Sequence, residues 1–146
     1  MQCPAYSVLM SLYAKECPEY LKESLDSMLA QTVPPTEIVM VKDGPLTDEL
    51  EAVLLDYDSA HPKLFKFIAY AENRGLGYAL RQGMLACSNE IVARMDTDDV
   101  ACPDRMEKQL AALNTGLDMV GSDVVEFIES PDKPIAITNL PKGSDA

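Results

Sequence analysis

Residues 91–99 read Ile-Val-Ala-Arg-Met-Asp-Thr-Asp-Asp, and the rest of the chain is organised around this stretch. Its apolar first half is typical of a buried strand, and it ends in the crowded carboxylates of Asp96, Asp98 and Asp99. Because ionised carboxylates repel one another and resist desolvation, such a cluster costs stability unless a cation lies among them. Hard divalent ions such as Mg²⁺ and Mn²⁺ prefer oxygen ligands of this kind. The stretch therefore indicates either a metal site at a strand end or a solvated acidic turn.

The sequence before this stretch alternates between strand-like and helix-like segments. Short apolar runs are separated by segments in which leucine and methionine return at helical spacing. Strands are expected at 6–13, 38–41, 65–70 and 91–95, and helices follow from about Pro18, Thr47, Leu76 and Pro103. Such alternation with short connections is the sign of right-handed βαβ units. We therefore predict an α/β fold with a mostly parallel sheet and helices on both faces.

Each expected helix has one apolar face and a plausible start. Pro18 suits a first helical turn, where its missing N–H is harmless, and Thr47 can cap the second helix. One or two further strands are expected within 117–128, whereas proline and glycine dilute the pattern after Ser130. The expected buried faces are Leu21, Leu25, Met28 and Leu29, then Leu50, Val53, Leu54 and Tyr57, then Leu76, Leu80 and Met84, and finally Met106, Leu110 and Leu113.

Polar residues follow each of the four expected strands. In a parallel sheet of this class, ligands sit at the carboxyl ends of the strands. Four strand ends therefore converge on one edge, and acidic residues follow three of them. This arrangement favours a binding site over a solvated acidic turn. The residues concerned are Lys15 and Glu16, Lys42 and Asp43, Glu72 to Arg74, and Asp96 to Asp99.

Composition limits the classes of function. The chain has 146 residues, of which 47% are hydrophobic and 25% charged, as expected for one compact domain. Its formal net charge of −12 argues against nucleic acid or an anionic membrane as a partner. A nucleotide remains compatible, because a metal ion can bridge acidic side chains to phosphate.

The cysteines and the single histidine do not suggest a metal site or a catalytic dyad. Cys3, Cys17, Cys87 and Cys102 are scattered, and His61 precedes a proline, so a zinc site is not expected. Free thiols without a secretion signal favour a reducing compartment, and no apolar run approaches the roughly 20 residues of a membrane span. A cytoplasmic location is the expectation.

Two other kinds of site were weighed against a metal-nucleotide site. Gly75 and Gly77 open a helix after a strand, but the dinucleotide fingerprint needs a third glycine where Leu80 stands, and it usually follows the first strand. A hydrolase would need two carboxyls held apart across a bond, and the aspartates at 96–99 are too clustered for that division of roles. A phosphatase-like metal site stays open as an alternative.

The order of motifs resembles the N-terminal half of the family 2 glycosyltransferases, which have the GT-A fold. The sequence around Asp43 and around Asp96 is most similar to that of bacterial capsule and exopolysaccharide transferases of the amylovoran-biosynthesis type. No single element is specific, but five in this order over about 110 residues are hard to obtain otherwise. The matching segments are 6–16, 24–32 (SLDSMLAQT), 37–44 (EIVMVKDG), 73–75 (NRG) and 96–99 (DTDD).

The resemblance implies a role for particular residues in binding a nucleotide-sugar donor. Asp43 would hydrogen-bond the nucleotide base, and Ser11 and Tyr13 would lie against base and ribose, with Glu16 in the same donor site. Asp98 would ligate Mg²⁺ or Mn²⁺ on the donor diphosphate, and Asp96 and Asp99 would contact the ribose or support the metal. Arg74 and Arg81 are candidates for phosphate contacts, with a surface arginine as the equal alternative. Two positions depart from the usual family pattern, Lys42 before Asp43 and Leu80 before Arg81. Because of these departures, the resemblance does not identify which sugar nucleotide is the donor.

The same resemblance predicts how the chain is divided and what it transfers. Residues 1–130 would form the donor-binding subdomain, and 131–146 a Pro/Gly-containing tail leading to a missing acceptor half that supplies the catalytic base. The expected reaction moves a sugar, UDP-linked by preference, to a polysaccharide or lipid-linked acceptor, so that the full-length protein could sit peripherally at the inner face of the membrane. This chain alone is expected to bind donor without turnover, and an uncovered edge or apolar patch could let it dimerise. The alternative is a non-catalytic nucleotide-binding or assembly module.

Overall fold

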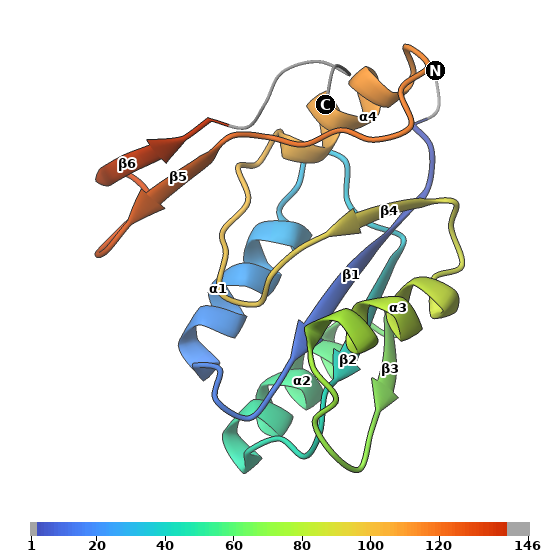
Figure 1. Ribbon diagram of the computed structural model, residues 1–146, viewed down its shortest axis with the longest axis vertical. Coiled ribbons are helices and arrows are strands. Elements are labelled where there is room, and N and C mark those ends of the chain that lie inside the picture. Colours follow the sequence, from blue (N-terminus) through green and yellow to red (C-terminus); the bar gives the residue numbers. More distant parts are fainter. Residues whose placement is uncertain (1–2, 140–146) are drawn as a thin grey trace. The chain divides into compact units, whose positions relative to one another are not determined.

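The computed structural model describes residues 3–139 and divides the chain into two units, one ending at Met106 and one beginning at Glu107. The first unit holds a four-stranded sheet with three helices (Figure 1). Its elements are β1 (Tyr6–Leu12), α1 (Pro18–Leu29), β2 (Glu37–Lys42), α2 (Asp48–Ala60), β3 (Phe65–Ala69), α3 (Leu76–Ala86) and β4 (Ile91–Arg94). Helix α4 (Arg105–Leu113) spans the division, and β5 (Val124–Phe127) and β6 (Pro134–Thr138) follow.

The sheet is parallel throughout, with the strand order β3-β2-β1-β4. The chain moves outward from β1 to β3 and then returns to the other side of β1. Because such crossovers are right-handed, α1 and α2 cover one face of the sheet and α3 covers the other. The predicted α/β architecture with helices on both faces is confirmed.

Local sequence accounts for where the helices of this unit begin. Pro18 occupies the first helical turn of α1, as predicted. The Thr47 side chain accepts a hydrogen bond from the N–H of Leu50 at 3.3 Å, so it caps α2 as predicted. Three acidic residues in the first turn of α2 also favour the positive end of its helix dipole.

The two inner strands, β1 and β2, form the centre of the core, and alternate side chains point to opposite faces. Leu9, Val39 and Val41 pack with Ala79 of α3 on one face. The alternate residues Val8, Met10, Leu12, Ile38 and Met40 are fully buried, as are Leu21, Leu25 and Met28 of α1 and Leu50 of α2.

The predicted buried face of α3 is wrong at two of its three positions, whereas Leu80 is partly buried and packs against the core. Leu76 and Met84 are 51% and 53% exposed, and the buried residues of this helix are Ala79 and Gly83. A Cβ added at Gly83 would lie 2.2 Å from the Leu9 Cδ1 atom and 3.0 Å from the Val41 Cγ2 atom. The helix therefore approaches the sheet through its small residues, which bring its backbone close to Leu9 and Val41.

The second unit contains an antiparallel hairpin of β5 and β6. Val125 pairs with Ile137, and the register shifts at Glu126 and Phe127. The hairpin provides one of the strands expected near 124–128, but residues 117–121 form no strand in the described chain. Strand β6 lies inside the segment expected to be an irregular tail, of which residues 140–146 lie outside the described residues.

None of the helices within residues 3–139 is long and apolar enough to cross a membrane. Cys3, Cys17, Cys87 and Cys102 are all free thiols in the described part of the chain.

Candidate functional site

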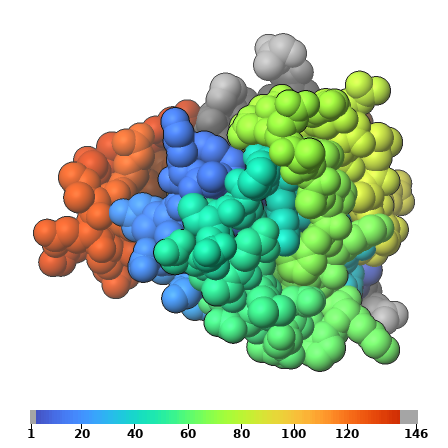
Figure 2. Space-filling model, turned by 90° about the horizontal axis from the view of Figure 1, so that it is seen from below, coloured from blue at the N-terminus to red at the C-terminus, as the bar shows by residue number. Residues whose placement is uncertain are grey.

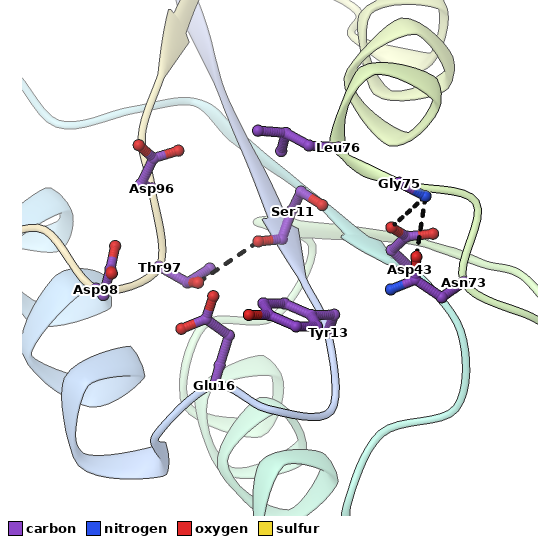
Figure 3. Close-up of a pocket in the computed structure, with 10 residues that line it drawn as sticks. All are labelled: Ser11, Tyr13, Glu16, Asp43, Asn73, Gly75, Leu76, Asp96, Thr97 and Asp98. Atoms are coloured by element: carbon purple, nitrogen blue, oxygen red, sulfur yellow. Dashed lines mark hydrogen bonds between the residues drawn. The ribbon is translucent and has the colours of Figure 1, made fainter.

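A cleft of about 460 Å³ opens at the carboxyl edge of the parallel sheet, the position expected for ligands in this fold class. Figure 2 views the molecule from this side and shows the segments after β1, β2 and β3 gathered on one face. The volume suits a small organic ligand. Figure 3 shows the lining residues, which are Ser11, Tyr13, Glu16, Asp43, Asn73, Gly75, Leu76, Asp96, Thr97 and Asp98.

Asp43 is the buried carboxylate of the cleft, with only 4% of its surface exposed. One carboxylate oxygen accepts the N–H of Arg74 at 2.7 Å. The other accepts the N–H of Gly75 at 3.1 Å, as Figure 3 shows. Two backbone donors offset the cost of burying this charge. Each oxygen keeps a lone pair, so the carboxylate can still accept a hydrogen bond from a ligand.

Gly44 allows the loop that carries these donors to approach the end of β2. Its φ of +90° is a conformation that side-chain-bearing residues rarely adopt, and a Cβ there would lie 2.8 Å from the backbone nitrogen of Asn73. The Asn73 side chain in turn accepts the N–H of Gly75 at 3.0 Å. The ends of β2 and β3 are therefore locked together at one side of the cleft.

The segment after β1 forms another side of the cleft. The Tyr13 carbonyl accepts the N–H of Glu16 at 3.1 Å, and this turn brings the Glu16 carboxylate back toward the aspartates (Figure 3). Tyr13 is 39% exposed and presents its ring to the cleft. Partial burial, and then the charges of Asp98 and Asp96, raise the pKa of Glu16.

The aspartate segment after β4 supplies the remaining side. Thr97 is 2% exposed and its hydroxyl donates to the Ser11 carbonyl at 3.5 Å, while Asp96 and Asp98 on either side reach the cleft. Asp96 also forms an ion pair with Arg94 at 3.1 Å. Partial burial, and then Asp96 and Asp98, raise the pKa of Asp99, against the opposing charges of Arg105 and Arg94.

Ser24 and Ser27 of α1, and Gln31 just after it, fix the backbone of the aspartate segment and of the residues that follow it. The Ser24 hydroxyl donates to the Asp96 carbonyl at 2.9 Å, and the Ser27 hydroxyl accepts the N–H of Ala101 at 3.0 Å. The Gln31 amide donates to the Cys102 carbonyl at 2.8 Å and accepts the N–H of Met106 at 2.9 Å. The segment 24–32 therefore does not line the cleft, but its hydrogen bonds hold in place the backbone that carries the aspartates.

Most of the residues predicted for donor binding meet in this cleft. Ser11, Tyr13, Glu16, Asp43, Asp96 and Asp98 all line it. Asp99 and Arg81 are not among its lining residues, and Arg81 is an exposed residue of α3. The Arg74 guanidinium lies against Tyr78, and only the backbone N–H of Arg74 serves the site.

The sequence assigned no individual role to four of the lining residues, Asn73, Gly75, Leu76 and Thr97, although Asn73 and Thr97 fall within the strand-end segments expected at this edge. Asn73 and Gly75 belong to a motif that had been singled out, and their position directly after β3 was the available signal. Thr97 lies between two predicted residues. Leu76 was assigned to the core because helical spacing alone does not say which face a helix buries.

The chemistry of the lining side chains fits a hard divalent cation. No group of three His, Cys, Asp or Glu side chains is close enough to hold a metal within residues 3–139. Glu16, Asp96 and Asp98 nevertheless face one another closely enough for the two aspartates to raise the pKa of Glu16. All three offer oxygen ligands, and a cation among them would relieve their mutual repulsion.

The chain resembles proteins from several organisms. It is 42% identical over 126 residues to the amylovoran biosynthesis glycosyltransferase AmsE of Erwinia amylovora, covering 85% of this chain and 47% of that protein. It is 36% identical over 141 residues to an Escherichia coli UDP-Gal:alpha-D-GlcNAc-diphosphoundecaprenol beta-1,3-galactosyltransferase, covering 94% of this chain and 50% of that protein. This chain therefore spans about half the length of these relatives.

A solved structure shows the same fold. The mannosyltransferase PcManGT from Pyrobaculum calidifontis, in complex with GDP-Man and Mn²⁺, superposes with a TM-score of 0.65 at 25% identity, covering 85% of this chain and 35% of that one. Staphylococcus aureus TarS gives a TM-score of 0.64 at 25% identity over 76% of this chain and 20% of that one. The sequence model of the family described as glycosyl transferase family 2 matches residues 7–141. With this match over nearly the whole chain, the parallel sheet and the acidic cleft at its carboxyl edge, the chain belongs to the family 2 glycosyltransferases and has the GT-A fold.

Proposed function

We propose that this chain is the donor-binding part of a glycosyltransferase that takes a UDP-sugar with Mg²⁺ or Mn²⁺. The observation that carries the proposal is the cleft itself, where Asp43 stands at one side and Asp96 and Asp98 at another, with the Tyr13 ring also at its edge. The Asp43 carboxylate is thus available to hydrogen-bond a nucleotide base, and the Tyr13 ring is available to stack on that base. The carboxylates of Asp96 and Asp98 are available to bind a cation. A nucleoside diphosphate needs these features together.

In this proposal each side chain has a separate task. The remaining lone pairs of Asp43 accept an N–H of the base, and the Tyr13 ring packs against its face. Asp98 would hold the divalent ion, with Asp96 and Glu16 available beside it and Asp99 as a supporting charge. When bound, the ion offsets the negative charge that develops on the departing diphosphate. Arg81 is kept as a candidate for a phosphate contact.

The acceptor side of the reaction concerns the full-length protein. The names of the two relatives support a polysaccharide or lipid-linked acceptor. We place the carboxylate that deprotonates the acceptor hydroxyl outside the cleft described above, in sequence that corresponds to the other half of the relatives. A lipid-linked acceptor would put the full-length protein at the inner face of the membrane, which fractionation of cells that express it would test.

Titration calorimetry with UDP and Mn²⁺ tests the donor site. We expect binding by the unaltered chain and a loss of affinity of about tenfold or more in Asp98→Ala, because a charge-assisted metal contact is removed. Asp56→Ala, which removes an exposed carboxylate from α2, is the matched control and should bind as the unaltered chain does. Absence of heat with the unaltered chain, or an unchanged affinity in Asp98→Ala, would contradict the proposal.

The same titration also tests which nucleotide base the cleft prefers. The Escherichia coli relative carries UDP-Gal in its name, whereas PcManGT was solved with GDP-Man. Competition between UDP and GDP for the Mn²⁺-loaded chain decides between them. Asp43→Asn should weaken whichever nucleotide wins, because the amide puts a donor where the base N–H needs an acceptor.

A further inference from the structure

The loop of residues 71–75, between β3 and α3, forms the wall of the cleft beside Asp43. Asn73 and Gly75 line the cleft, and the N–H groups of Arg74 and Gly75 hold both oxygens of the Asp43 carboxylate. The position of that carboxylate thus depends on the loop as much as on β2. What holds the loop therefore matters for ligand binding.

Two tyrosines close the loop at its base. Tyr70 precedes the loop and Tyr78 follows it on α3, and their rings meet edge to face, with centroids 5.3 Å apart and an interplanar angle of 62°. The N–H of Tyr70 donates to the Lys42 carbonyl at 3.2 Å, which ties the pair to β2, just before Asp43. This is a favourable geometry for an aromatic pair.

Arg74, within the loop, lies over the ring of Tyr78. Its guanidinium carbon is 5.0 Å from the centroid of the Tyr78 ring, and its Nη1 atom donates to the Tyr78 hydroxyl at 3.3 Å. Glu72 stands 3.8 Å from the same guanidinium. The side chain of Arg74 therefore contacts Tyr78 and Glu72 and does not line the cleft, while its backbone N–H donates to Asp43.

The hydroxyl of Tyr70 and its ring make different contributions to the structure. Its oxygen is buried and has no hydrogen-bond partner among the described residues. Burial, and then Tyr78 and Asp43, raise the pKa of this hydroxyl, against the opposing charge of Arg74. Since an unpaired buried hydroxyl gives no stabilisation, the contribution of Tyr70 comes from its ring.

We propose that Tyr70, Arg74 and Tyr78 form an aromatic clamp, a set of positioning residues that holds the loop 71–75 against Asp43. The clamp rests on the proposed nucleotide site for its functional meaning, because it sets the orientation of the carboxylate that meets the base. It has no part in holding the proposed cation, which Glu16, Asp96 and Asp98 would hold. A defect in the clamp should therefore weaken the binding of the base and spare the binding of the diphosphate.

Amide hydrogen exchange, measured by NMR without any ligand, tests the clamp directly. In Tyr78→Leu the N–H groups of Arg74 and Gly75 should exchange about tenfold faster, since both the ring pair and the cation–π contact are lost. Tyr70→Phe, which keeps the ring and removes the unpaired hydroxyl, is the matched control and should leave both rates unchanged. The N–H of Leu50, held by the Thr47 cap, reports whether α2 stays intact.

Several outcomes would overturn the clamp. Unchanged exchange at Arg74 and Gly75 in Tyr78→Leu is one, and equal acceleration at Leu50 is another. If Tyr78→Leu does not fold, Arg74→Ala removes only an exposed side chain and should speed the Gly75 exchange by about threefold. Rates equal to those of the unaltered chain in that variant also overturn the proposal.

A titration arm separates this inference from the proposed function. With Mn²⁺ present, Tyr78→Leu should bind UDP several-fold more weakly and bind pyrophosphate, which has no base, as the unaltered chain does. In an Asp43→Asn background the same substitution should cost little, because the clamp acts through Asp43. Equal weakening toward both ligands contradicts the clamp. Failure of the unaltered chain to bind UDP contradicts the proposed function, and the exchange rates still decide the clamp.

Discussion

At the scale of single residues, the site depends on one glycine as much as on its acids. Gly44 lets the end of β2 lie against the backbone of Asn73 at a φ of +90°. The dipeptide Asp43-Gly44 thus supplies both the carboxylate and the space for the loop that holds it. A side chain at residue 44 would force these two segments apart.

We expect Gly44→Ala to lower the free energy of unfolding by about 1–3 kcal/mol, from backbone strain and the clash with Asn73. The matched control is Gly77→Ala, because a Cβ at Gly77 meets nothing within 4 Å and lies in α3, where alanine is the better helix former. Urea denaturation followed by circular dichroism measures both. A Gly44→Ala chain as stable as the unaltered one would show that the two segments can separate freely.

The rule that polar groups at parallel strand ends gather on one edge predicted Glu16, Asp43, Asp96 and Asp98 in the cleft lining. Ser11 and Tyr13 were predicted only through the family resemblance. The same reasoning could not tell that Asp99 and Arg81 would be outside the lining set. Which way a side chain points depends on the backbone of its segment. Here that backbone is set by distant partners such as Ser24, which binds the Asp96 carbonyl.

At the scale of elements, sequence patterns located the strands and helices of the first unit but misjudged one interface. The spacing of Leu76, Leu80 and Met84 suggested a buried face on α3, yet Ala79 and Gly83 face the sheet. A prediction from helical periodicity selects the large apolar residues as the buried ones. The close approach of α3 to Leu9 and Val41 instead requires small residues at the interface. Strand β6 was missed because prolines diluted its pattern, and only its pairing with β5 identifies it.

A polar junction joins the beginnings of β1 and β2 to the segment after α3. The Glu37 carboxylate accepts hydrogen bonds from the Ser7 hydroxyl at 2.5 Å, the Ser88 N–H at 2.8 Å and the Ser88 hydroxyl at 2.7 Å. Burial raises the pKa of Glu37, but these hydrogen bonds and the charge of Lys66 outweigh it and leave the pKa below the ordinary value of 4.5. The junction therefore favours the ionised carboxylate.

This lowered pKa predicts a specific dependence of stability on pH. Since the folded-state pKa of Glu37 lies below the unfolded value, its contribution is fully present above about pH 4.5 and is lost as the pH falls through the folded-state value. Glu37→Gln should therefore lose less stability than the unaltered chain between about pH 5 and pH 3. Glu23→Gln, an exposed change on α1, is the control. Parallel curves of unfolding free energy against pH for Glu37→Gln and the unaltered chain would rule out this role.

At the scale of the whole molecule, the charge of the chain opposes the ligand that we propose for its cleft. The net charge of −12 repels a nucleoside diphosphate, and the cleft adds Glu16, Asp43, Asp96 and Asp98. Local charge complementarity must then come from a cation. This requirement links the composition of the whole chain to the chemistry of one strand end.

Salt and metal should therefore act on UDP binding together. With a chelator present, we expect UDP binding to be weak at low salt and to strengthen as ionic strength rises from about 20 to about 300 mM, because screening reduces the repulsion. With Mn²⁺ present, binding should be far tighter and should not strengthen with salt, since the ion replaces repulsion by attraction within the cleft. Titrations across this range measure both trends, and Asp56→Asn should keep the same metal requirement because its carboxylate lies outside the cleft. UDP binding of equal affinity with chelator and with Mn²⁺ would mean that the acidic side chains at the end of β4 hold no cation for the diphosphate.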